Sequence, residues 1–520
     1  MQRLFIFAVG GTGSRVLRSL NFLLASGIDG LTSQTEIFPL IIDYDKVNGD
    51  KNRALECIEN YRDVRRAFEK YPDQKDEFFM TDIKTIGSLT PEGKTTFDMV
   101  FAPKHGMNKF KDSIGYIYLN GNMVSTRYLL ESLYDTSSDR SRAELDIDMT
   151  TGFQGNPNIG SVVFDELQNT PEYKEFKTVF NHQTDRIIII GSLFGGTGSS
   201  GIPALISAIR SKDAPKNIQG ATVGIIMVLP YFNLGAETNG VAGSIKPEIF
   251  ASKVKASLNF YEDSGLNKEF DTIYYVGDQN LSKFNYAEGG EHQKDRANIV
   301  EFIAALSVVH FIRSSKNEGT VYYKYGTECN LYGNNGQKRI SYKDLKKDDF
   351  ACGVLKRLNQ LTLSLKYFSD VIESKPLSLK NRSFYKFIFD NVTSWETHTN
   401  GNDKLQDLCY YLHLFYKRYK EWLAELADGN NGHELVMYDL DKPMHEMFYG
   451  YHLTKKTSLW TKEMPIVKES DLTLEVENAF SAHHYEKGKG LKTPDKEFVL
   501  MDILRKGSET LMNAKINNNL

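Results

Sequence analysis

The sequence predicts an α/β protein with a doubly wound, mostly parallel sheet, a central helix and a more helical C-terminal domain. Three observations support this fold class. Short apolar runs alternate with helical patterns through the first half of the chain, as is typical of parallel sheets. Two of these runs lead directly into glycine-rich loops that precede helices. Long helical stretches then dominate the second half.

The predicted strands are short and rich in β-branched or aromatic residues. In chain order they are residues 4–9, 37–42, 186–191, 222–229 and 272–276. Helical patterns cover residues 14–26, 62–70, 126–133 and 201–210. Residues 295–312 contain no Gly or Pro and are largely apolar, so they predict one buried helix. The clearest helical pattern of the second half is residues 404–428.

Length and composition exclude several classes of protein. A chain of 520 residues is too long for one compact core and predicts two or three domains. The net charge of −4 does not supply the basic surface that a nucleic-acid-binding protein needs. Its four cysteines form no Cys-x-x-Cys pair, which argues against a disulfide framework or zinc ribbon and fits a reducing cytoplasm. No apolar run approaches the ~20 residues of a membrane-spanning helix.

The first glycine-rich loop lies between a strand and a helix and consists of Gly10, Gly11, Thr12, Gly13 and Ser14. Glycines let the backbone approach a phosphate closely, and the amides at a helix N-terminus stabilise its charge. This motif alone also fits a tight turn with glycines needed for packing.

Two further loops follow predicted elements at suitable places. Asp43 and Asp45 end the second strand, where an acid typically contacts a ribose hydroxyl or a metal-bound water. Gly155 and Asn156 belong to a loop rich in Gly and Asn that precedes a helix. That loop is suited to close over a terminal phosphate, although an ordinary surface turn has the same composition.

The strongest motif follows the buried strand at 186–191. It combines glycines with hydroxyl side chains ahead of a helix, and its members are Gly195, Gly196, Thr197, Gly198, Ser199, Ser200 and Gly201. Backbone amides and hydroxyls together can surround an α- or β-phosphate. Each glycine inside a helix or strand lowers stability by up to about 1 kcal/mol relative to alanine. A loop with this many glycines therefore indicates a ligand that must approach the backbone closely.

In order and spacing, these loops resemble the phosphate loops of the tubulin/FtsZ family. The Gly-Gly-Thr-Gly core at 195–198 resembles the family signature, and the loop at 152–160 is similar to the one that faces the γ-phosphate. The resemblance covers about residues 1–312 and is closest to divergent bacterial tubulin-like proteins. It implies GTP or GDP as the ligand, and a triphosphate further implies Mg²⁺ on charge grounds.

The resemblance also assigns the base side and the domains. Asp278 or Asn280, together with Asn298, would face guanine. Residues 1–290 would form the nucleotide-binding domain with an insertion around 61–150. Residues 291–314 would form the central helix, and residues 315–520 the C-terminal domain. The family assembles head-to-tail, so the expected partner is a second copy of the chain, with other protein partners left open for the C-terminal domain.

Catalysis is the point where the sequence departs from the family. The acidic loop expected after the central helix is not recognisable, and Glu318 is the only carboxylate close to that position. Glu318 is therefore either a catalytic acid or a solvated loop residue, and GTP hydrolysis is expected to be slow.

Three alternatives share parts of this pattern. A ThiF-like or ubiquitin-activating-type adenylating enzyme would explain the first loop and Asp43 to Asp45, but not the loop at 195–201. A dinucleotide oxidoreductase is disfavoured because Val16 occupies the third glycine position of the Rossmann fingerprint. A nucleotide-gated scaffold without hydrolysis would keep the fold and lack turnover.

Overall fold

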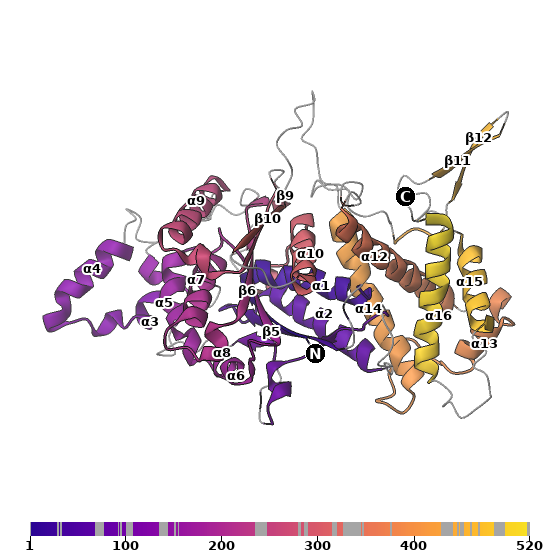
Figure 1. Ribbon diagram of the computed structural model, residues 1–520, viewed down its shortest axis with the longest axis horizontal. Coiled ribbons are helices and arrows are strands. Elements are labelled where there is room, and N and C mark those ends of the chain that lie inside the picture. Colours follow the sequence, from indigo (N-terminus) through magenta and orange to yellow (C-terminus); the bar gives the residue numbers. More distant parts are fainter. Residues whose placement is uncertain are drawn as a thin grey trace.

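The computed structural model has an elongated outline, with the main sheet between two groups of helices (Figure 1). Helices α3 (Phe110–Ser113), α4 (Val124–Tyr134) and α5 (Pro157–Phe164) lie at one end, and the C-terminal helices lie at the other. The structure describes residues 2–28, 31, 34–67, 77–91, 93, 96–99, 108–134, 144–149, 152–153, 155–234, 247–278, 282–284, 290–314, 320–325, 345, 348–374, 377–427, 440–444, 447, 452–457, 460–465, 468–482 and 495–516.

The main sheet has eight strands, all paired in parallel, in the order β10-β8-β6-β5-β1-β2-β3, with β4 also paired to β2. Their bounds are β1 Gln2–Val9, β2 Thr35–Ile42, β3 Asp82–Ile83, β4 Asp98–Met99, β5 Asp185–Ser192, β6 Thr222–Val228, β8 Thr272–Val276 and β10 Val321–Tyr325. The predicted fold class, a doubly wound parallel sheet followed by a helical C-terminal region, is confirmed.

The inner strands are continuous apolar runs because helices cover both faces of the sheet. In β1, Ile6 lies opposite Ile188 of β5, and both side chains are fully buried. The helices of this half are α1 Gly10–Ala25, α2 Gly49–Arg66, α3 Phe110–Ser113, α4 Val124–Tyr134, α5 Pro157–Phe164, α6 Pro171–Val179, α7 Gly196–Arg210, α8 Lys216–Gln219, α9 Pro247–Asp263 and α10 Ile299–Arg313. Two short strands, β7 Phe232–Leu234 and β9 Ser282–Phe284, pair in a separate small sheet.

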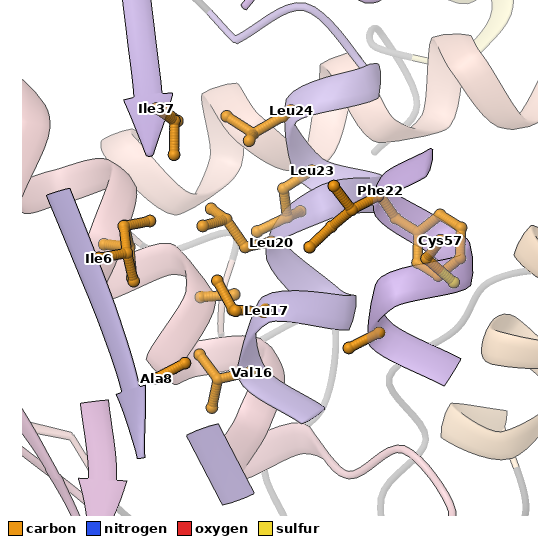
Figure 2. Close-up of a cluster of buried hydrophobic side chains, with 14 of the residues drawn as sticks. Ile6, Ala8, Val16, Leu17, Leu20, Phe22, Leu23, Leu24, Ile37 and Cys57 are labelled. Carbon is orange, nitrogen blue, oxygen red and sulfur yellow. The ribbon is translucent and has the colours of Figure 1, made fainter. Parts of the chain in front are cut away.

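Helix α1 lies between the sheet and α2 (Figure 2). Leu20 faces Ile6 of β1, while Phe22 lies toward Cys57 of α2. All four side chains are almost completely buried. The first helix is therefore held on two sides, and this fixes the position of its N-terminus at the edge of the sheet.

Three predicted helix starts were wrong by a turn or more. Helix α1 begins at Gly10 rather than at residue 14, and α7 at Gly196 rather than at 201, so each glycine loop forms the first turn of its helix. Helix α10 begins at Ile299 rather than at 295, because Asn298 and Glu301 form a capping box there. The pattern predicted at 62–70 is the end of α2, which Asn48 caps.

The C-terminal part is mainly helical. Its elements are α12 Asp349–Tyr367, α13 Ser383–Phe389, α14 Lys404–Ala427, α15 Glu469–Ala482, α16 Lys496–Leu511 and the antiparallel hairpin of β11 His452–Thr457 and β12 Trp460–Pro465. Helix α14 packs on α1, where the Trp422 ring lies 4.9 Å from the Phe22 ring and Trp422 Nε1 donates to Ser19 Oγ at 3.2 Å. No helix in the described part of the chain is long and apolar enough to cross a membrane.

Candidate functional site

The sheet order brings the two glycine-rich loops together. Strands β1 and β5 are parallel neighbours, and the chain runs outward from them in opposite directions. Open α/β sheets bind ligands at such a switch point, outside the carboxyl ends of the strands. The loops after β1 and β5 meet there, because a β-carbon added to Gly10 would lie 3.2 Å from Cβ of Thr197.

The first loop is the positive end of α1. Gly10 has φ of +73°, a conformation that favours glycine. Ser14 donates its hydroxyl to the Gly10 carbonyl at 3.2 Å and so stabilises the first turn from within. Among the described residues no side chain caps this helix, and its first turn holds no acid. Its amides are therefore oriented toward the space beyond the sheet edge, as in anion-binding helix termini.

Only part of the first loop can meet a ligand. A β-carbon at Gly13 would lie 2.7 Å from the carbonyl carbon of Ala8, so this glycine is required by packing on β1. Thr12 is buried and accepts a hydrogen bond from Nη2 of Arg15 at 3.3 Å. Gly11 keeps partial exposure, which makes it the best-placed residue of this loop for contact with a phosphate.

In the loop after β5, as in the first loop, some residues are required by packing and others remain partly exposed. A β-carbon at Gly198 would lie 2.4 Å from the carbonyl oxygen of Ser192, so the fold requires this glycine whether or not a phosphate binds. The Ser199 hydroxyl donates to the Gly195 carbonyl. Gly195 and Thr197 keep partial exposure, and the described side chains provide no cap for α7.

The predicted loop that contains Gly155 and Asn156 lies against the loop after β5. A β-carbon at Gly196 would come within 3.1 Å of the backbone nitrogens of both Gly155 and Asn156. Asn156 is the N-cap residue of α5, without a side-chain cap hydrogen bond, and Gly155 has φ of +76°. The helices α1, α5 and α7 thus begin at one place, and none has an acid in its first turn.

A lysine that the sequence did not indicate lies beside this place. Lys253 of α9 donates from Nζ to the Gly155 carbonyl at 2.6 Å. Ser257, one turn later, donates to the Leu193 carbonyl at 3.1 Å and ties α9 to the loop after β5. Burial lowers the pKa of Lys253. A partly desolvated ammonium group at this point favours an anionic ligand.

The two acids after β2, Asp43 and Asp45, are buried and are bound within the turn that they begin. Burial raises the pKa of Asp43 to about 7. Its Oδ1 accepts from the Asp45 amide at 3.1 Å. Asp45 in turn accepts from the amides of Val47, at 3.0 Å, and Gly290, at 2.6 Å. Both carboxyls stabilise this turn, and Asp45 joins it to the segment before α10.

Of the residues predicted for the base, the structure describes Asn298, the N-cap residue of α10, and Asp278, which follows β8. Asn298 is buried, its Oδ1 accepts from the Val300 amide at 2.9 Å, and its backbone amide donates to Glu301 at 3.0 Å. Asp278 is buried just beyond the end of β8. Two predicted residues, Asn280 and Glu318, lie outside the described residues.

A buried ionic cluster next to the first loop was not predicted. Arg15 donates from Nε to Glu301 at 2.5 Å, and from Nη1 to Asp50 at 2.5 Å and to Asp295 at 3.0 Å. Its Nη2 donates to the Tyr231 hydroxyl at 2.7 Å. The guanidinium therefore connects the first turns of α1, α2 and α10 with the loop after β6.

Three carboxyls around one guanidinium give this cluster an excess of acid. Burial raises the pKa of Asp295 to about 7 and also raises the pKa values of Asp50 and Glu301. A sequence signal for it existed, because Glu301 is the only charged residue from Ile299 to Val309. Fully buried charges are rare unless they are paired.

Comparisons with known proteins give little beyond this geometry. No family model matches the chain, and no curated protein matches it. A solved structure with some similarity is CetZ from Methanosaeta thermophila strain DSM 6194, at 16% identity and a TM-score of 0.28. The match covers 61% of this chain and 56% of that one, so the chain spans little more than half of that protein's length. The function therefore has to be argued from the site itself.

Proposed function

We propose that this chain binds a nucleoside triphosphate, with guanine as its base, at the edge where β1 and β5 end. The observation that carries the proposal is the meeting of three helix N-termini, those of α1, α5 and α7, at the switch point of a parallel sheet. Each helix N-terminus is equivalent to roughly half a positive charge. No acid in their first turns neutralises that charge.

The partly exposed residues of these loops are the ones that we expect to hold the phosphates. The backbone amides of Gly11, Gly195 and Thr197 would donate to them, with Asn156 and Lys253 next to the terminal phosphate. A bound Mg²⁺ would neutralise part of the triphosphate charge. In the described part of the chain no group of three or more acidic, His or Cys side chains could hold a metal ion, so Mg²⁺ would be carried mainly by the phosphates and water.

The choice of guanine comes from the resemblance to the tubulin/FtsZ family. Carboxylate and amide groups such as those of Asp278 and Asn298 can pair with the donor and acceptor edge of guanine. A site that depends on such hydrogen bonds rejects adenine strongly, because mismatched polar groups remain buried and unpaired.

Assembly is the second part of the proposal. In the family that the sequence resembles, the nucleotide lies at a head-to-tail contact between subunits, and a heterologous contact that does not close on itself produces a filament. We propose that GTP promotes self-association here and that hydrolysis is slow, because only Glu318 stands near the position of the missing acidic loop.

One set of measurements tests both parts. The nucleotide released from the denatured purified protein should be GTP or GDP, and Mg²⁺-GTP should bind more tightly than Mg²⁺-ATP in a titration. Equal affinities would favour an adenylating enzyme. Sedimentation with GTP, with GDP and without nucleotide, together with phosphate release across protein concentrations, tests assembly and turnover. A monomer under all three conditions would contradict the assembly, and assembly without phosphate release would indicate a nucleotide-gated scaffold.

A further inference from the structure

One carboxylate of the C-terminal helices contacts three elements at the proposed nucleotide edge. Glu425 of α14 accepts from Arg18 of α1 at 2.6 Å and from the Ala297 amide, just before α10, at 2.8 Å. It also accepts from Arg53 of α2. Arg18 and Arg53 each lie more than 370 residues away from Glu425 in the sequence.

The contacts are sheltered from water. The side chain of Arg18 is only 4% exposed and that of Glu425 is 18% exposed. A carboxylate has about four acceptor sites, and donors from three elements occupy those of Glu425. Loss of this carboxylate would leave the buried Arg18 guanidinium without its described ionic partner, which favours displacement of α1 or α14.

The contacts of Glu425 continue, through other polar side chains, to the first glycine-rich loop. Arg18 lies on the same helix as Gly11, and Arg53 also donates to the Asp295 carbonyl at 2.9 Å. The Asp295 carboxyl pairs with Arg15, whose Nη2 donates to Thr12. A continuous chain of polar contacts therefore runs from the first glycine loop to α14.

We propose that Glu425 is a positioning residue of the nucleotide site, which holds α1 and the start of α10 in register and couples ligand binding to the docking of α14. The proposal rests on the proposed nucleotide function. Because coupling between two sites is reciprocal, a ligand at the glycine loops must stabilise α14 as much as a docked α14 favours the ligand.

Hydrogen exchange with and without Mg²⁺-GTP tests this on the wild-type chain. Exchange should slow in peptides from residues 10–25 and 196–210, and also in peptides from residues 404–427. Slowing at the loops without any change in α14 would overturn the coupling and leave nucleotide binding intact. No slowing at the loops would overturn the nucleotide function and the coupling with it.

Variants separate positioning from simple stabilisation. Glu425→Gln should reduce GTP affinity within the range of about 5- to 150-fold that is typical of coupled sites. At saturating GTP, its loops should still be protected while α14 no longer responds. The matched control is Glu421→Gln, an exposed position one turn earlier on the same helix, which should change neither quantity. If Glu425→Gln does not fold, Arg53→Met leaves the Arg18 and Ala297 contacts of Glu425 in place, removes the hydrogen bonds of Arg53 to Glu425 and to the Asp295 carbonyl, and should give a smaller effect of the same kind. Wild-type affinity and an unchanged α14 response in either folded variant would overturn the proposal.

Discussion

Two glycines of the paired loops should respond in opposite ways to the same substitution. A β-carbon at Gly11 would have as its nearest neighbours Gln293 at 3.5 Å, Arg15 at 3.6 Å and Asn48 at 3.8 Å, all ordinary contacts with side chains. Gly11 lies inside α1, where alanine is favoured over glycine by up to about 1 kcal/mol. Gly11→Ala should therefore fold with equal or slightly higher stability.

Ligand binding should nevertheless suffer in Gly11→Ala. The added methyl group would stand beside the amides of the first turn of α1, where we place the phosphates. We expect GTP affinity to fall at least tenfold, which corresponds to about 1.4 kcal/mol of binding free energy.

Gly198→Ala provides the contrast. Its β-carbon would lie 2.4 Å from the carbonyl oxygen and 2.8 Å from the nitrogen of Ser192, and these backbone atoms cannot turn away. Overpacking of this kind typically costs about 1–3 kcal/mol, so this variant should lose stability.

Urea unfolding and calorimetric titration with Mg²⁺-GTP measure the two effects separately. A folded Gly11→Ala that binds GTP with wild-type affinity would refute the phosphate site at α1. A Gly198→Ala variant as stable as the wild type would refute the packing role.

Three further predictions concern the neighbourhood of the site. Lys253→Met should weaken GTP binding about tenfold and GDP binding less, because an ammonium near the terminal phosphate acts mainly on the triphosphate; the exposed Lys255→Met is the control, and equal losses for both nucleotides would contradict this position for Lys253. The pKa of Asp43 is raised from 3.8 to about 7 in the folded chain, so folding retains a proton there. Its contribution to stability is complete below pH 3.8 and is lost as the pH rises toward 7 and beyond. Asp43→Asn should therefore reduce the loss of unfolding free energy between pH 5 and pH 8, by up to about 1.4 kcal/mol for each pH unit between 5 and about 7; parallel pH profiles for variant and wild type would rule this out. Trp422→Ala removes a fully buried side chain between α14 and α1 and should cost about 3–5 kcal/mol in urea unfolding, and a cost below 1 kcal/mol would mean that α14 is not docked there.

The strands and the order of the loops could be predicted because their signals are local. The central parts of β1, β5 and β6, residues 4–9, 187–191 and 223–228, contain no polar side chain, and a strand buried on both faces requires that composition. Glycine-rich segments between a strand and a helix are equally visible. Their convergence at a single edge then follows from the rule that the carboxyl ends of parallel strands lie together.

The rest depends on contacts between residues far apart in the chain. Arg15 and Glu301 are 286 positions apart, and nothing near either residue indicates the other. The edge strand β10 has only five residues, and although its Val and Tyr residues favour strands, its place beside β8 depends on a segment far away in the chain. Lys253 lies on a helix whose approach to Gly155 is set by the loop after β5.

The position of the ionic cluster explains why the phosphate loops alone do not define the site. Glycine amides can hold an anion only if the helices that carry them keep a fixed direction, and glycine has no side chain with which to fix it. Here the direction of α1 is set by Arg15 and Arg18, whose partners lie on α2, α10 and α14. Buried ion pairs add little net stability, because desolvation offsets most of their attraction, and their best-attested use is to specify register. On this proposal the site depends on the C-terminal helices as well as on the region that resembles the tubulin/FtsZ family, and Glu425 is one of the points at which the two parts meet.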